Sequence, residues 1–357
     1  MNIVEATKRY ETWLGEAVPL VRRDLKLKHR TMEESAFGFL RATYYRWTQQ
    51  FPKACPEAAA APAILIVGDL HLENFGAWRD GEARLAWGIN DFDEAHRGAY
   101  ANDLVRLAAS ALVAIEEGSL YIGAERAAAE ILSGYAQAMA EKEGKPFVLE
   151  EDNTALRALA MSDTRSPKKF WKKILAAKDV APPDAVKAML TEHLPQGAPQ
   201  IAFKRRTAGA GSLSLPRFVA TRLVSGSRVA REAKARAPSA HAWATDGKHD
   251  PSHTPAILAR AIRPRDPFLH VGESWIVRRL APHCENIELA DIADAAERRA
   301  VLNAMGRETA NIHRGTQGAR ARILKHLDKQ KDGWLYDAAA TMAEGVRKDW
   351  KVWKKRG

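Results

Sequence analysis

The most informative part of the sequence is Val67-Gly-Asp-Leu-His-Leu-Glu-Asn-Phe-Gly76, followed by Ile89-Asn-Asp-Phe-Asp-Glu94. Residues 63–67 are all apolar, which predicts a strand buried on both faces just before the first segment. Between the segments, Asp80-Gly81 predicts a hairpin turn, and the alternating apolar residues of 85–89 predict the returning strand. The hairpin therefore brings two clusters of carboxylate and amide oxygens side by side.

Both clusters have the side chains that a magnesium and phosphate site uses. Mg²⁺ is bound in proteins by one or two carboxylates together with phosphate oxygens. The residues come in the order Asp69, Asn74 and, after the hairpin, Asp91. In kinase active sites the first Asp accepts the hydroxyl proton, while an Asn and a second Asp hold the metal. Each residue alone is typical of an ordinary loop, but their order and flanking strands together predict a phosphoryl-transfer site.

A second informative segment is Thr207-Ala-Gly-Ala-Gly-Ser-Leu-Ser214, which lies between two β-like runs. Its glycines, Gly209 and Gly211, would let backbone N–H groups approach phosphate oxygens, and the surrounding arginines would offset their charge. Most glycine-serine turns of this kind are simple hairpins, so the segment gains meaning only from its position relative to the acidic clusters.

The composition predicts a packed protein in a reducing compartment. The chain has 357 residues, of which 46% are hydrophobic and 28% charged, enough for two lobes or one large α+β domain. Its two cysteines, Cys55 and Cys284, lie far apart and form neither a disulfide framework nor a thiolate zinc site. The longest apolar stretch, residues 58–67, is about half of what a bilayer requires. With no secretory apolar segment at the start, we expect a cytoplasmic protein without a membrane span.

The net charge of +11 is compatible with nucleic acid, a membrane surface or another polyanionic ligand, and does not choose among them. Basic residues cluster at 168–173, at 204–236 and at the C-terminus, in places beside tryptophans. Lys/Arg interleaved with aromatic residues can bind single strands, but amphipathic helices give the same pattern. No recognisable nucleic-acid motif is present, so nucleic acid is a possible partner that we do not favour.

Periodicity divides the chain into four regions. Apolar spacings of three and four predict helices over the first sixty residues and over 103–140, with a break around Gly118. Residues 150–192 are helical and basic, 201–205, 218–224 and 274–280 are β-like, and 291–314 and the C-terminus are helical. Residues 238–267 carry few structural signals. We expect an N-terminal helical segment (1–62), a region with the catalytic loop (63–195), a β-containing nucleotide-binding region (196–315) and a C-terminal helical segment (316–357).

The acidic motifs resemble known phosphotransferases. Gly68-Asp69-Leu70-His71-x-x-Asn74 is similar to the catalytic loop of aminoglycoside and choline phosphotransferases, and Ile89-Asn90-Asp91-Phe92-Asp93 to their metal-binding segment. More closely, the chain resembles a bacterial kinase-like family known as domain of unknown function family 2252. The matching blocks are 35–41, 68–76, 90–94, 209–212, 275–278 and 311–313.

The resemblance implies a fold, two cofactors and a set of roles. The fold would be α+β and protein-kinase-like, with two lobes and extra helices at both ends. It would be circularly permuted, because the glycine-rich region follows the catalytic loop in this chain. The cofactors would be ATP and Mg²⁺. Asp69 would be the catalytic base, Asn74 and Asp91 metal ligands and Asp93 a second acidic ligand, while Asp103 would accept backbone hydrogen bonds that brace the loop.

For the nucleotide, the resemblance implies contacts from Gly209, Gly211 and Ser212. The chain departs from the family pattern at Ser214, where a third glycine is usual. It departs again where the phosphate-pairing lysine is expected, because that position is Arg231. A planar guanidinium and a compact ammonium demand different geometry. Arg231 is therefore the first candidate for the phosphate contact, and Lys204 or Lys234 could substitute for it in space.

Several smaller questions stay open at this stage. Ser35 reads as a helix N-cap, and Arg41 could contact substrate or a loop carboxylate. Either Arg278 or Arg279 must face inward on its strand and needs an anionic partner. His313 reads as a structural histidine, and His71 and Glu73 as residues that shape the loop.

The predicted function is an ATP- and Mg²⁺-dependent phosphotransferase acting on an unknown small-molecule or protein acceptor. Three alternatives remain. One is a nucleotidyl transferase on the same fold, and another is a pseudokinase or basic nucleic-acid-binding module without turnover. The third, a metallophosphoesterase, requires further histidines and carboxylates on later strands, and no Gly-Asn-His segment follows.

Overall fold

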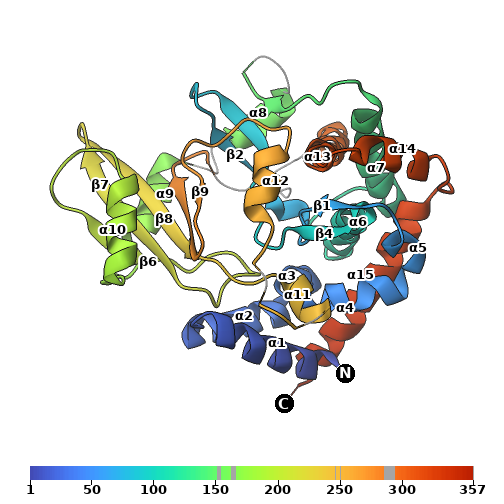
Figure 1. The fold of residues 1–357 in the computed structure, drawn as a ribbon, viewed down its shortest axis with the longest axis horizontal. Coiled ribbons are helices and arrows are strands. Elements are labelled where there is room, and N and C mark those ends of the chain that lie inside the picture. Colours follow the sequence, from blue (N-terminus) through green and yellow to red (C-terminus); the bar gives the residue numbers. More distant parts are fainter. Residues whose placement is uncertain (151–153, 162–165, 246, 250, 285–293, 357) are drawn as a thin grey trace.

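The computed structural model describes the chain except residues 151–153, 162–165, 246, 250, 285–293 and 357. It consists of a largely helical part, which we call the body, and a smaller part built on a five-stranded sheet, which we call the lobe (Figure 1). Sequence expectation and structure agree on a mixture of helices and antiparallel sheets.

The body begins and ends with helices that pack on one another, so the two termini lie near each other in Figure 1. The N-terminal helices are α1 (Ile3–Ala17), α2 (Arg22–Glu34), α3 (Ala36–Ala42), α4 (Tyr44–Ala54) and α5 (Pro56–Ala59). The later ones are α6 (Tyr100–Glu116), α7 (Ala124–Ala140), α8 (Thr154–Ala160), α13 (Ala295–Arg314), α14 (Ala319–Leu327) and α15 (Trp334–Lys354). Every helix among the described residues is too short or too polar to cross a lipid bilayer.

Two small sheets of the body carry the acidic segments. β1 (Ala63–Ile66) pairs antiparallel with β4 (His96–Ala99). The predicted hairpin consists of β2 (Phe75–Arg79) and β3 (Leu85–Ile89), with Phe75 opposite Ile89, and β5 (Phe147–Val148) adds a third strand. The short helix η1 (Leu72–Asn74) connects the end of β1 to β2, so residues 67–74 are held at both ends by strands.

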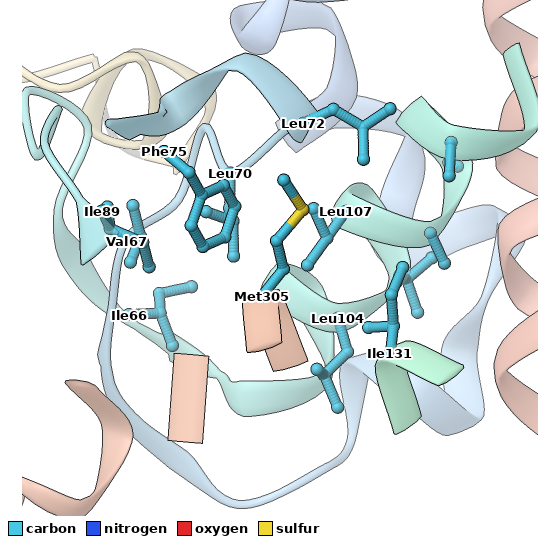
Figure 2. Close-up of a cluster of buried hydrophobic side chains, with 14 of the residues drawn as sticks. Ile66, Val67, Leu70, Leu72, Phe75, Ile89, Leu104, Leu107, Ile131 and Met305 are labelled. Atoms are coloured by element: carbon cyan, nitrogen blue, oxygen red, sulfur yellow. The ribbon is translucent and has the colours of Figure 1, made fainter. Parts of the chain in front are cut away.

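A hydrophobic core lies directly beneath this connection. Figure 2 shows Leu70 and Phe75 of the connection meeting Leu104 and Leu107 of α6 and Met305 of α13. All five side chains have no solvent exposure, and burial of such a side chain contributes about 1.5–3 kcal/mol. The core thus fixes the connection from below and leaves its polar residues on the upper side.

The lobe contains the remaining strands in the order β6 (Ala202–Arg205), β7 (Arg217–Val224), β8 (Ser227–Ala235), β10 (Trp275–Leu280) and β9 (His270–Val271). Helix α9 (Pro167–Leu175) covers one face of the sheet through Phe170 and Ile174, and α10 (Asp184–His193) covers the other through Val186 and Leu190. The basic helices of residues 167–193 therefore pack with the sheet that follows them in the chain.

The sequence did not predict all of these elements. Strand β8 alternates alanine with charged residues and gives no β-like signal. Residues 238–267, which carry few signals, contain α11 (Ala240–Thr245) and α12 (Thr254–Arg260), and both pack on the body. The helix expected over 291–314 is α13, and residues 291–293 lie outside the described part of the chain.

Candidate functional site

One pocket gathers most of the predicted site residues. The body contributes Asp69, Asn74, Asp91 and Asp93, and the loop of residues 207–214, which joins β6 to β7, contributes Gly209, Gly211 and Ser212. We call residues 207–214 the glycine-rich loop. The pocket has a free volume of about 100 Å³, below the 300–1,000 Å³ typical of small-molecule sites. The pocket is therefore narrow, and the glycine-rich loop lies opposite the acidic residues of the body.

Asp103 braces the backbone that leads into the pocket. Its carboxylate accepts hydrogen bonds from the N–H groups of Val67 (2.7 Å) and Gly68 (2.9 Å). His313 Nε2 lies 3.0 Å from Asp103 Oδ2, and its Nδ1 lies 2.9 Å from the hydroxyl of Tyr135. The predicted structural roles of Asp103 and His313 are confirmed, and both residues are fully buried.

Asp69 projects from this braced backbone and is held by Arg106. Arg106 donates from Nε to Asp69 Oδ1 (2.8 Å) and also contacts it through Nη2. The guanidinium lies 4.8 Å from the ring centres of both Tyr44 and Trp47. Burial raises the pKa of Asp69 above its usual range, against the opposing effect of Arg106. Asp69 is thus a carboxylate with one oxygen fixed and an increased affinity for a proton.

The second oxygen of Asp69 faces the glycine-rich loop. A methyl group at Gly211 would lie 3.5 Å from Asp69 Oδ2 and 3.2 Å from the carbonyl of Arg41. On the other side, Asn74 donates from Nδ2 to the backbone carbonyl of Asp69 (2.6 Å). A side chain at Gly211 would thus be in ordinary van der Waals contact with the carboxylate and tight against the Arg41 carbonyl, which places the loop backbone beside Asp69.

Lys234 joins the lobe to the acidic segment. Its ammonium contacts Asp93 directly and lies 3.6 Å from Asp91 Oδ2. Burial raises the pKa of Asp91, but Lys234 and Arg278 outweigh it, so the pKa is lowered. Burial and the charge of Asp91 raise the pKa of Asp93. Two adjacent carboxylates thus share one cation, and the pair retains affinity for positive charge.

These groups fit Mg²⁺ of the kind bound together with phosphate. Among the described residues, no three His, Cys, Asp or Glu side chains form a complete metal cage. Mg²⁺ does not need one, because it binds one or two carboxylates and takes its other ligands from phosphate and water. Asp91 and Asp93 would supply the carboxylates, and Asn74, which lines the same pocket, has an amide oxygen that would be a third protein donor.

Two predicted nucleotide contacts lie elsewhere. Arg231 packs over the ring of Phe268 at 4.5 Å, on the opposite side of strand β8 from Lys234. Lys204 pairs with Asp179 at 2.8 Å. Neither residue lines the pocket, and Lys234 does not line it either, but Lys234 contacts the acidic residues that do. The lysine that the structure brings to the acidic segment is Lys234, which the sequence offered only as a substitute.

The remaining predictions concern supporting residues. Ser35 caps α3 by accepting a hydrogen bond from the N–H of Gly38 (2.8 Å), and Arg41 pairs with Glu73 at 2.5 Å. The helix cap expected at Ser35 and the carboxylate contact expected for Arg41 are therefore both present.

The strand arginine that faces inward is Arg278, and its anionic partner is Glu232. Arg278 donates from Nε to Glu232 Oε2 at 2.7 Å. His71 accepts from the N–H of Glu73 at 3.2 Å, which fits its expected role in shaping the loop.

Sequence reasoning missed three residues of this pocket region. Arg106, Lys28 and Glu94 were not predicted, although Lys28 and Glu94 line the pocket and Arg106 holds Asp69. Burial raises the pKa of Glu94 to about 8. Only Arg106 had a signal in the sequence. It follows Asp103 by three residues, and residues at this spacing are neighbours on a helix surface, so Arg106 could have been placed near the loop that Asp103 braces.

Comparison with known proteins gives one result. No curated protein matches the chain, and no solved structure does. The family model described as "uncharacterized protein conserved in bacteria" matches residues 20–246, which include both acidic segments and the glycine-rich loop. This protein therefore belongs to domain of unknown function family 2252.

Proposed function

We propose that this protein is an ATP- and Mg²⁺-dependent phosphotransferase. The observation that carries the proposal is the convergence of Asp69 and Asp91 from the body with the glycine-rich loop and Lys234 from the lobe. Phosphoryl transfer requires a positioned hydroxyl, a metal held by carboxylates, and donors for the phosphate oxygens. The protein side of each requirement is present here: Asp69 for the hydroxyl, Asp91 and Asp93 for the metal, and the glycine-rich loop with Lys234 for the phosphates.

The arrangement of the lobe supports a kinase-like relationship. In protein kinases a glycine-rich loop covers the phosphates, and the phosphate-pairing lysine is on the third strand. In this protein the glycine-rich loop joins the first two strands of the five-stranded sheet, β6 and β7, and Lys234 is on the third, β8. The kinase comparison thus assigns the lysine role to Lys234 and leaves Arg231 outside the site. Because the lobe follows the catalytic loop in sequence, the fold would be a circular permutation.

Each polar group then has a role in the reaction. Asp69 would accept the proton of an acceptor hydroxyl as its oxygen bonds to the γ-phosphorus. The bond from that phosphorus to the β–γ bridging oxygen breaks, and ADP leaves with the electron pair. Mg²⁺, when bound, would neutralise charge on the phosphates. Asn74, Asp91 and Asp93 would hold it, and Lys234 would exchange its carboxylate partners for phosphate oxygens.

The narrow pocket implies that nucleotide entry moves the glycine-rich loop. With a free volume of about 100 Å³, the pocket is smaller than typical ligand sites. The loop approaches Asp69 closely at Gly211. We therefore expect the loop to move away from Asp69 as the phosphates enter.

The test uses ATP labelled at either the α or the γ phosphate, incubated with Mg²⁺ and the purified protein. We expect only the γ label to leave the nucleotide, and the Asp91→Ala variant to lose both this activity and Mg²⁺-dependent ATP binding. Transfer of the α label would indicate a nucleotidyl transferase instead. If wild-type protein neither binds ATP nor transfers label, the proposal fails and a binding function without turnover replaces it.

A matched pair of lysine variants tests the assignment within the lobe. Lys204 and Lys234 are both buried on the same face of the sheet and both pair with aspartates. We expect Lys234→Met to weaken ATP·Mg²⁺ binding by at least about tenfold, as loss of a charged phosphate contact does. Lys204→Met should bind as wild type does; equal losses in the two variants would remove Lys234 from the nucleotide site.

A further inference from the structure

Lys28 is a buried lysine that faces the pocket without an anionic partner. It lies on α2, its residue is 2% exposed, and it lines the same pocket as Asp69. Its ammonium lies 5.9 and 5.7 Å from the ring centres of Tyr10 and Tyr45. Within the part of the chain that the structure describes, Lys28 makes no hydrogen bond and no ion pair.

A lysine buried to this extent, with two aromatic rings but no carboxylate beside its ammonium, is unfavourable and calls for an explanation. Removing a charge from water costs several kcal/mol unless an opposite charge or hydrogen bonds compensate. The other two buried lysines, Lys204 and Lys234, both have carboxylate partners. Lys26, on the same helix, is exposed to solvent. Lys28 therefore lacks the compensation that the other buried lysines have, which is the expected condition of a binding group before its ligand arrives.

Lys28 lines the same pocket as Asp69 and Glu94. Burial lowers the pKa of Lys28, and the carboxylates of Glu11, Glu94 and Asp69 oppose this shift. Asp91 and Asp93 are instead paired with Lys234. We call the part of the pocket that Lys28 lines the Lys28 end, and the Asp91 and Asp93 carboxylates together with Lys234 the Lys234 end.

The residues around Lys28 favour a small ligand that has both apolar and polar groups. Leu14, Leu215 and Pro238 add apolar side chains to the lining of the pocket. Tyr10 adds a hydroxyl that makes no hydrogen bond among the described residues, whereas the hydroxyl of Tyr45 is bonded to Thr7 at 2.8 Å. The free volume of about 100 Å³ leaves room for a small acceptor only if the glycine-rich loop moves, and a compact acceptor requires less movement than a large one.

We propose that Lys28, assisted by the hydroxyl of Tyr10, binds the anionic group of a small acceptor that carries both a hydroxyl and a carboxylate or phosphate. This inference rests on the proposed phosphotransferase function and adds the class of acceptor to it. The anion would hold the acceptor so that its hydroxyl faces Asp69, while the nucleotide occupies the Lys234 end.

The experiment measures the melting temperature of the full chain as inorganic phosphate is added, with and without saturating ADP and Mg²⁺. Occupation of the Lys234 end by ADP leaves the Lys28 end for phosphate. Three proteins are compared: wild type, Lys28→Met and the matched surface control Lys26→Met. Glycerol, glycerate and glycerol phosphate, which differ in the anionic group, are then compared at equal concentration in the same assay.

We expect phosphate to stabilise wild type and Lys26→Met, with an affinity at least about tenfold weaker in Lys28→Met. Glycerate or glycerol phosphate should stabilise more than glycerol, and only when Lys28 is present. Without ligand, Lys28→Met should melt no lower than wild type, because it removes an uncompensated charge and keeps a similar volume.

Other outcomes overturn the inference. Equal stabilisation of Lys28→Met and wild type by phosphate would remove Lys28 from the anion site, and so would a lack of any anion response in wild type. A strongly lowered melting temperature of Lys28→Met without ligand would assign Lys28 a structural role. Because phosphate is also tested without ADP, a Lys28-dependent response can be seen even if the protein binds no nucleotide, which separates failure of this inference from failure of the proposed function.

Discussion

Two carboxylates, Glu232 in the lobe and Asp69 in the body, have opposite environments: one is saturated with arginines and the other is not. Glu232 in the lobe has no solvent exposure and pairs with Arg206 (2.5 Å), Arg217 (3.3 Å) and Arg278 (2.7 Å). Burial alone would raise its pKa, but the arginines hold the pKa well below its usual range. Asp69 in the body has one arginine and 18% side-chain exposure, and its pKa is raised. The first carboxylate has no capacity left for a ligand, whereas the second keeps an oxygen for one.

The largest expected effect is a loss of turnover when Asp69 is replaced. Asp69→Asn retains an oxygen for Arg106 but removes the proton acceptor, so turnover should fall by about 100- to 10,000-fold while ATP·Mg²⁺ binding persists. Transfer of γ-labelled phosphate and ATP titration measure the two quantities. Turnover comparable to wild type would remove Asp69 from the role of base.

Glu232→Gln should show the opposite profile. Three guanidinium groups would lose their shared negative charge in a buried position, and breaking such a pair costs about 3–5 kcal/mol of unfolding free energy. Denaturant titration measures the loss, with Asp69→Asn as the matched variant that should lose much less. If the two variants lose stability equally, the contrast between a structural and a reactive carboxylate does not hold.

A third carboxylate, Glu94, adds a different case to the comparison. It accepts hydrogen bonds from the Ser239 hydroxyl (3.1 Å) and the Ala240 N–H (2.7 Å), and no cation of the described residues pairs with it. Burial raises its pKa from 4.5 to about 8. The folded state therefore binds the proton more tightly, and this stabilisation is present at low pH and is lost as the pH rises toward 8.

Glu94→Gln should flatten the fall in unfolding free energy between pH 5 and pH 8. Since Glu94 is partly exposed, we expect the difference in slope to stay below about 1 kcal/mol per pH unit. Thermal unfolding of both proteins across that range measures it, with an exposed Glu57→Gln variant as control. Parallel pH profiles for wild type and Glu94→Gln would contradict the assignment.

The sequence predicted the parts of the fold that local patterns determine. Strand 63–66 follows from a continuous apolar run, strand 85–89 from apolar alternation, and the turn between β2 and β3 from Asp80-Gly81. The acidic pocket residues were predicted because they are close in sequence and joined by that hairpin. Prediction and structure agree best in segments whose geometry depends on few contacts between residues distant in sequence.

Placement of the cations depended on tertiary structure and could not be predicted. Strand β8 contains Arg231 and Lys234 three positions apart, so they point to opposite faces, and only its pairing with β7 decides which face meets Asp93. Helix α2 carries several basic residues, and nothing local distinguishes Lys28, which turns inward, from Lys26, which remains exposed. Register and helix rotation are set by packing partners distant in sequence.

The contact between α7 and α13 has a consequence for comparing members of the family. A methyl group at Gly306 would overlap the carbonyl of Ile131, and one at Gly134 would overlap that of Asn303, so the two helices touch backbone to backbone. Helix α13 also brings His313 to Asp103, yet it lies beyond residue 246, where the family match ends. An alignment limited to the matched segment would thus contain the polar residues of the pocket floor and omit a helix that fixes them. Covariation between residues 103 and 313 can be seen only when whole chains are aligned.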